Sequence, residues 1–137
     1  MILAAVLVAG CNLFGDLTSD RVVGIIVSDS MRPVIIAPDT VQVGVTFTAT
    51  VNTFGSSSCT DPDGVDLALS ASLARIVPYD LVQTAGACTA DFASRPHPVT
   101  IHFTQQGAAT IRVVARMSRP TGPTTTDSLE RALHVRP

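Results

Sequence analysis

The stretch that decides the fold is Val41-Gln-Val-Gly-Val-Thr-Phe-Thr-Ala-Thr-Val-Asn52. Its odd-numbered positions are apolar, and its even-numbered positions are polar or glycine. A period of two over this length is typical of a β-strand with one face in a core and the other in water. The pattern inverts at Thr53 and Phe54, so we predict that the strand ends or bulges near Thr53.

A second alternation covers residues 67–73, where Leu67, Leu69 and Leu73 recur with small or polar residues between them. It predicts another strand, with a helix as the alternative because leucine and alanine favour helices. The run Arg95-Pro-His-Pro98 predicts a break in regular structure.

The last third of the chain is more regular. Residues 99–103 and 109–117 both alternate, and the short segment Gln105-Gln-Gly107 between them predicts a hairpin. Further strands are expected at residues 21–28, 34–37 and 129–135, and loops at 55–64 and 119–127. Seven to eight strands without a strongly amphipathic helix indicate an all-β antiparallel sandwich.

Two segments resemble bacterial Ig-like domains. Ala37-Pro-Asp-Thr-Val-Gln-Val-Gly44, followed by Phe47-Thr-Ala-Thr-Val51, is similar to their first strands. Gly107-Ala-Ala-Thr-Ile-Arg-Val-Val-Ala115 is similar to their penultimate strand. The resemblance covers roughly residues 22–136 and implies an Ig-like domain over residues 21–137. The chain departs from antibody domains because it lacks tryptophan and places its cysteines in predicted loops.

The N-terminal end carries a second resemblance. Residues 1–10 form an apolar run, and Leu7-Val-Ala-Gly-Cys11 resembles the lipobox of bacterial lipoproteins. The resemblance implies that residues 1–10 are a signal peptide, that Cys11 becomes the lipidated first residue, and that residues 11–20 form a tether. No basic residue precedes the apolar run, which departs from the usual signal. The alternatives are a plain cleaved signal, or a buried first element with Cys11 as a core residue.

Lipidation would place the protein in the bacterial cell envelope. By resemblance, Cys11 would carry several acyl chains, palmitate among them, which together anchor a protein stably. Asn12 stands where the family often has an aspartate in proteins retained at the inner membrane, so it favours the outer membrane.

The remaining cysteines, Cys59 and Cys88, form an even pair. In an exported protein such a pair predicts a disulfide, whereas in a reducing compartment both would be free buried thiols. The bridge would stabilise the fold by about 3.5 kcal/mol in the chain-entropy model.

The composition and net charge limit the kinds of partner that the protein is expected to bind. The chain is 46% hydrophobic and 15% charged, which argues against disorder. Its formal net charge of -2 gives no electrostatic basis for binding nucleic acid. A face that meets lipid headgroups or a polysaccharide would hold Arg112, Arg116, Arg119 and Arg131, but we favour their interpretation as a solvated strand face.

Metal chemistry has weak candidates. Asp61, Asp63 and Asp66 lie close enough in sequence to supply oxygen ligands to calcium, but their spacing is not that of an EF-hand, and Pro-Asp-Gly is ordinary turn chemistry. His97, His102 and His134 are widely separated, and we interpret them as solvated surface residues. We therefore expect no resident metal and no cofactor.

No catalytic constellation emerges from the sequence. It contains no Gly-x-Ser-x-Gly motif, phosphate-binding loop or spacing that selects an acid/base pair. The leading hypothesis is a membrane-anchored, non-catalytic Ig-like module for binding, adhesion or envelope structure, with a protein or glycan as ligand. The alternative is a small exported hydrolase or metal-handling protein, which a pocket gathering His97, His102 and an aspartate would favour. A third hypothesis is one domain of a longer surface protein.

Overall fold

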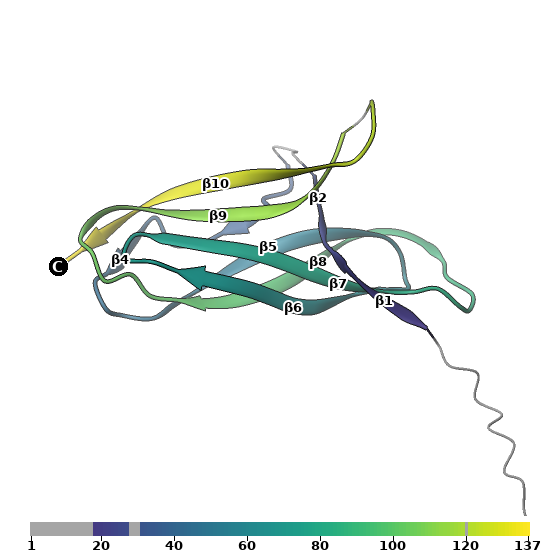
Figure 1. Cartoon of the computed structure of the whole chain (residues 1–137), viewed down its shortest axis with the longest axis horizontal. Coiled ribbons are helices and arrows are strands. Elements are labelled where there is room, and N and C mark those ends of the chain that lie inside the picture. The colour runs from purple at the N-terminus through teal and green to yellow at the C-terminus, as the bar shows by residue number, and fades with distance from the viewer. Residues whose placement is uncertain (1–17, 28–30, 120) are drawn as a thin grey trace, which may run out of the picture.

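Strands supply all the regular secondary structure in the computed structural model, which describes residues 18–27, 31–119 and 121–137 (Figure 1). The described strands are β1 (Ser19–Val23), β2 (Ile25–Val27), β3 (Ile35–Ile36), β4 (Thr40–Gln42), β5 (Phe47–Ser57), β6 (Thr60–Leu69), β7 (Leu73–Gln83), β8 (Ala90–Ile101), β9 (Gly107–Ser118) and β10 (Thr125–Arg136). The ten strands exceed the seven to eight predicted because the predicted strands at residues 21–28, 41–52 and 67–73 each correspond to two.

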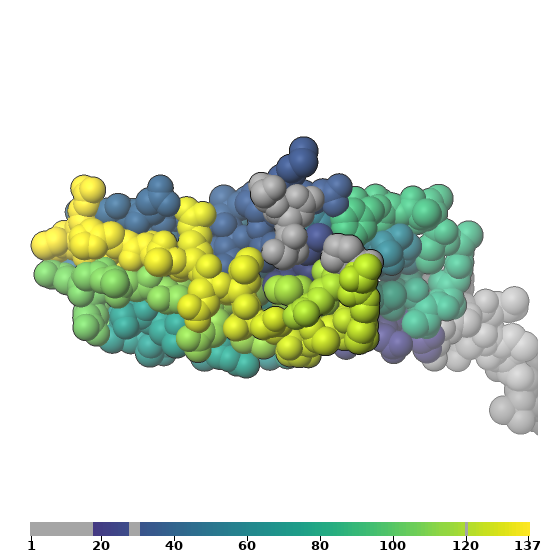
Figure 2. Space-filling model, turned by 90° about the horizontal axis from the view of Figure 1, so that it is seen from above, coloured from purple at the N-terminus to yellow at the C-terminus, as the bar shows by residue number. Residues whose placement is uncertain are grey.

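The strands form two sheets. The smaller sheet has the order β3-β5-β8 and is antiparallel. The larger sheet has the order β1-β7-β9-β10-β4, with β2 also paired to β9 and β6 to β7. Because the β7–β9, β2–β9 and β10–β4 pairs are parallel, this sheet is mixed and not wholly antiparallel as predicted. Figure 2 shows β10, in yellow, at the surface between β9 and the blue part of the chain that holds β4.

A single hydrophobic core joins the two layers. The larger sheet contributes Ile76, Ile111 and Val113, and the smaller sheet contributes Val51 and Ile101, all fully buried. The other core members include Ile26, Val41, Ala49, Val99, Phe103 and Val135. The molecule therefore has an all-β, sandwich-like fold, which confirms the predicted class.

The stretch from Val41 to Asn52 is two strands in different sheets. β4 pairs with β10 in the larger sheet, whereas β5 pairs with β3 and β8 in the smaller one. Gly44 has a φ of 72°, which glycine adopts readily, so the chain turns there. Alternate residues are buried in both strands because both face the same core, whereas Val45 between them is 50% exposed. β5 also runs past Thr53, and its register shift lies later, between Gly55 and Ser57.

The segment 67–73 contains a hairpin turn. These residues form strands and not the alternative helix. The chain nevertheless reverses between β6 and β7, where the Ser70 N–H donates to the Leu73 carbonyl at 2.8 Å. Leu67 and Leu69 are consequently 37% and 40% exposed, while Ala74 and Ile76 enter the core.

The Arg95–Pro98 run does not break the structure but lies within β8. Asn52, which is paired with Pro96, donates its backbone N–H to Val34 on the β3 side of β5. In an antiparallel ladder, the nitrogens of Pro96 and Pro98 therefore point away from β5, to the outer edge of the sheet. Proline is tolerated at such an edge because no ladder hydrogen bond is lost.

The predicted hairpin over residues 99–117 is also wrong. β8 and β9 belong to different sheets, and the segment between them crosses the sandwich. β9 instead forms its hairpin with β10, in a register from Met117–Thr125 to Gly107–Val135. Periodicity could not distinguish the two arrangements because β8 and β9 bury alternate residues in one core.

Candidate functional site

A groove of about 270 Å³ opens on the outer face of the smaller sheet. Three segments line it: residues 31–33 before β3, Asn52 and Phe54 of β5, and Phe92 and Ser94 of β8. The β-strand period of two places these β5 and β8 side chains on the face opposite the core. Asn52 holds the first segment in place, because its side-chain amide donates to the Pro33 carbonyl at 3.0 Å.

Two phenyl rings form the floor of the groove. The rings of Phe54 and Phe92 stack, with centroids 5.6 Å apart and an interplanar angle of 14°. Phe54 is 5% exposed, whereas Phe92 is 53% exposed. The guanidinium of Arg32 lies 4.8 Å from the centroid of the Phe92 ring, within the range of a cation–π interaction. The groove thus combines an accessible aromatic ring, a cation, an amide and a hydroxyl.

A buried polar cluster lies deeper in the sandwich. The Thr53 hydroxyl donates to Asp80 Oδ1 at 2.9 Å, and His97 Nε2 lies 3.0 Å from both that oxygen and the Thr53 hydroxyl. All three residues are at most 2% exposed. Gly24 packs against the cluster, and a Cβ there would lie 2.3 Å from the Thr53 methyl group. Gly24 separates β1, which pairs with β7, from β2, which pairs with β9, so the predicted strand at residues 21–28 is divided there.

The cluster is not a nucleophile triad. In such a triad the carboxylate and the nucleophile bind different ring nitrogens, so that the imidazole relays a proton. Here Asp80 and Thr53 both contact Nε2, while His97 Nδ1 is buried without a partner. The cluster is therefore suited to joining β5, β7 and β8 across the sandwich.

The three histidines do not come together. His97 is buried, so its interpretation as a solvated surface residue is wrong. Periodicity does not reveal its burial, because the run Arg95-Pro-His-Pro98 predicts a break in regular structure and not a strand. His102, directly after β8, and His134 on β10 are both exposed, in agreement with the predicted solvent-facing positions.

Two of the three candidate calcium ligands form side-chain interactions within the domain. Asp63 pairs with Arg21 at 2.6 Å, and Asp66 accepts the Tyr79 hydroxyl at 2.9 Å. Asp61 is exposed on β6. Within the described ranges, the structure gathers no group of three histidine, cysteine, aspartate or glutamate side chains that could hold a metal.

The bond between Tyr79 and Asp66 makes a testable prediction. Hydrogen bonding to the Asp66 carboxylate raises the pKa of Tyr79 above its ordinary value of 10.0, while the nearby Arg21 acts in the opposite direction. The folded state therefore holds this proton more tightly than the unfolded chain. The resulting stabilisation is complete below pH about 10 and is lost as the pH rises through the raised pKa.

Ultraviolet titration can follow this group, because the chain has one tyrosine and no tryptophan. We expect the tyrosinate midpoint to lie above pH 10.0 and to fall toward that value in Asp66→Asn. Asp61→Asn, which removes a carboxylate from the same strand, should leave the midpoint unchanged. Equal midpoints in the wild type and Asp66→Asn would contradict the assignment.

The arginines do not form a single patch. Arg112 pairs with Glu130 at 2.6 Å, Arg119 with Asp127 at 3.5 Å, and Arg131 with Asp39 at 2.8 Å. The Arg116 Nε donates to the Val23 carbonyl, joining β9 to the end of β1. Each cation thus has a local partner, and Arg131 lies on the opposite face of the hairpin from Arg112.

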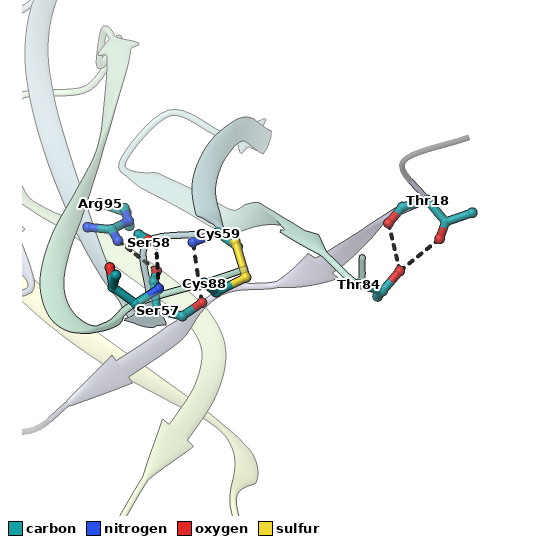
Figure 3. Close-up of a disulfide and its surroundings, with 8 residues drawn as sticks. Thr18, Ser57, Ser58, Cys59, Thr84, Cys88 and Arg95 are labelled. Atoms are coloured by element: carbon teal, nitrogen blue, oxygen red, sulfur yellow. Dashed lines mark hydrogen bonds between the residues drawn. A yellow bond between two sulfur atoms is a disulfide. The ribbon is translucent and has the colours of Figure 1, made fainter. Parts of the chain in front are cut away.

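Cys59 and Cys88 form a disulfide, as predicted (Figure 3). It joins the β5–β6 turn to the β7–β8 connection, at the end of the sandwich where Thr18 and Thr84 bond to each other. The Ser58 N–H bonds to the Thr89 carbonyl at 3.0 Å, and Arg95 donates to the Ser57 carbonyl at 3.0 Å. Most of the predicted loop 55–64 is therefore strand, with a short turn beside the bridge. Of the predicted loop 119–127, Arg119 and residues 121–124 lie outside the strands, whereas residues 125–127 belong to β10.

Cys11, the predicted lipidation site, lies outside the described residues. The groove residues Arg32 and Phe92 escaped the sequence analysis altogether. One signal pointed to the groove: Phe54 stands on the polar face of its strand, where a large apolar residue is unusual.

Comparison with protein-family models, with curated proteins and with solved structures finds no match for this chain. The described residues contain no helix that is long and apolar enough to cross a membrane. The class that the structure defines is therefore a disulfide-bridged, sandwich-like β domain with a small aromatic groove.

Proposed function

We propose that the protein is a lipid-anchored module of the bacterial cell envelope that binds its ligand non-covalently at the groove. The anchor would be Cys11, exposed as the first residue after removal of residues 1–10. Residues 11–20 would tether an Ig-like domain, and Asn12 favours the outer membrane. The lipobox-like sequence Leu7-Val-Ala-Gly-Cys11 carries the anchoring part of this proposal.

The disulfide supports an exported location. Disulfides persist in oxidising compartments such as the periplasm and the cell surface, and they are rare in the cytosol. The Cys59–Cys88 bridge fits its surroundings, with a Cα–Cα distance of 5.5 Å and hydrogen bonds between the two joined segments.

The groove supports binding over catalysis. An exposed ring with a few polar groups around it is the usual composition of a ligand site. Of the titratable side chains in the described part, only Arg32 lines it, and arginine does not act as a general base. The Ig-like assignment rests on the segments 37–51 and 107–115, and the mixed larger sheet would be a variation on that family's plan.

Intact mass of the membrane-extracted, full-length gene product tests the anchor. We expect a chain that begins at Cys11 and carries additional acyl mass, located in the membrane fraction of a bacterial host. Cys11→Ala should lack the acyl mass and leave that fraction. The matched control, Cys59→Ala with Cys88→Ala, removes the other two cysteines and should remain acylated. An unmodified wild type that retains Met1 would overturn the lipoprotein proposal.

A further inference from the structure

We propose that the groove and the outer face of the smaller sheet bind an acidic polysaccharide, with a sugar carboxylate on Arg32 and the same sugar ring against Phe92. The inference builds on the proposed function, because the envelope is where a tethered domain would meet such a polymer. Four observations carry it: the charge, the ring, the polar track along the sheet and the edge of β8.

The positive charge of Arg32 favours an anionic ligand at this surface. Arg32 is exposed, and among the described residues no carboxylate lies within ion-pair distance of its guanidinium. By contrast Arg21, Arg112, Arg119 and Arg131 each pair with a described carboxylate. The described residues that line the groove include no acidic side chain. A guanidinium binds a carboxylate through two parallel hydrogen bonds, which suits a carboxylated sugar.

The shape of the groove suits one sugar ring. Its volume of about 270 Å³ is at the lower limit of ligand pockets, so it accepts a single ring and not a folded partner. The half-exposed Phe92 ring is fixed by its stack on the buried Phe54. The guanidinium of Arg32 also lies over this ring, so a pyranose would pack its C–H face against the part of the ring that stays exposed, beside the guanidinium. Asn52 and Ser94 supply polar atoms for hydroxyl groups beside it.

The outer face of the sheet continues the groove as a track. Beyond the groove residues Asn52 and Phe92, its exposed or half-buried side chains on the three strands are uncharged: Ile36, Thr48, Thr50, Ser94, Pro96, Pro98 and Thr100. The β8 part of this track runs from Phe92 to Thr100, about 26 Å at strand spacing, so it could follow several sugars of a chain. Hydroxyl side chains offer both donors and acceptors, which match the hydroxyl groups of a polysaccharide.

The edge of β8 argues against a peptide strand as the occupant. In the described part of the chain β8 pairs with β5 alone, so its other edge is unpaired. A peptide that adds to an edge needs successive backbone donors. Pro96 and Pro98 remove two consecutive outward donors from this edge, which is also how natural sheets discourage edge pairing.

The test uses full-length protein in detergent with a neutral headgroup, titrated calorimetrically with oligomers of galacturonic acid and with hyaluronan oligosaccharides. We expect at least one acidic probe to bind, and its carboxyl-reduced form to bind at least tenfold more weakly. Arg32→Gln and Phe92→Ala should each weaken binding at least tenfold. Arg75→Gln, an exposed cation on β7 in the other sheet, is the matched control and should bind as the wild type does.

Several results would overturn the inference. They are no binding of either acidic probe, equal binding of the carboxyl-reduced form, or an equal loss in Arg75→Gln. Tighter binding to a polyglutamate peptide would assign the groove to acidic peptides, and tighter binding to phosphatidylglycerol vesicles would assign it to lipid. None of these outcomes affects the intact-mass result, so failure of the ligand assignment is distinguishable from failure of the anchor.

Discussion

Replacing His97 by alanine is expected to lower the free energy of unfolding by about 3–5 kcal/mol, the usual cost of removing a large buried side chain that also hydrogen-bonds to a buried polar group. Asp80 is 2% exposed and relies on His97 and the Thr53 hydroxyl for its hydrogen bonds. Without the imidazole, the carboxylate remains buried beside an empty space, and neither water nor a side chain replaces the lost donor fully. Urea unfolding followed by circular dichroism measures the loss.

Three variants separate the hydrogen bonds from simple packing. Thr53→Val should cost about 1 kcal/mol, the value of one hydrogen bond. Asp80→Ala combined with His97→Ala should cost at least 1 kcal/mol less than the sum of the single changes, because the two side chains interact directly. Thr53→Val, Asp80→Leu and His97→Leu together should restore much of the stability, since apolar residues often replace a buried polar group without loss. A cavity of about 90 Å³ beside Asp80 gives the larger side chain room.

Additive single changes would contradict this account of the cluster. They would mean that the 3.0 Å contact between His97 Nε2 and Asp80 Oδ1 adds nothing to the stability beyond the packing of the two side chains. His97 would then be an ordinary core residue.

Periodicity predicted the buried faces better than it predicted the connections between strands. Ala49, Val51, Val99, Ile101 and Ile111 all occupy the core, as their alternation indicates. Alternation reports which side chains face the core, but both sheets face the same core. A strand that changes sheets at Gly44, or between β8 and β9, therefore looks the same in sequence as one that continues or forms a hairpin.

The candidate site was less predictable for a related reason. The β8 strand was hidden by Pro96 and Pro98, which are compatible with a strand only because their nitrogens face its free edge. An edge position depends on the tertiary arrangement and not on local composition. Because the alternation over residues 99–103 predicts only the end of β8, nothing in the sequence places Phe92 beside Phe54, or His97 beside Asp80.

Removing the disulfide with Cys59→Ala and Cys88→Ala is expected to lower the free energy of unfolding by about 3.5 kcal/mol. The bridge closes a loop with a sequence separation of 29 residues and so restricts the unfolded chain. It also joins the β5–β6 and β7–β8 connections, both of which pass from one sheet to the other. Urea unfolding should show a lower midpoint and a larger m value, because the unbridged chain exposes more surface when it unfolds.

Reduced wild-type protein is the matched comparison, because it keeps both sulfur atoms and loses only the bond. It should unfold at nearly the midpoint of the double variant, whereas Cys11→Ala should unfold as the oxidised wild type does.

A typical domain has a total stability of about 5–15 kcal/mol, so a loss of this size makes the fold marginal under reducing conditions. A loss below about 1 kcal/mol would show that hydrogen bonds such as Ser58 to Thr89 hold the two connections without the bridge. The domain would then be stable in either compartment, and the disulfide would no longer argue for the envelope.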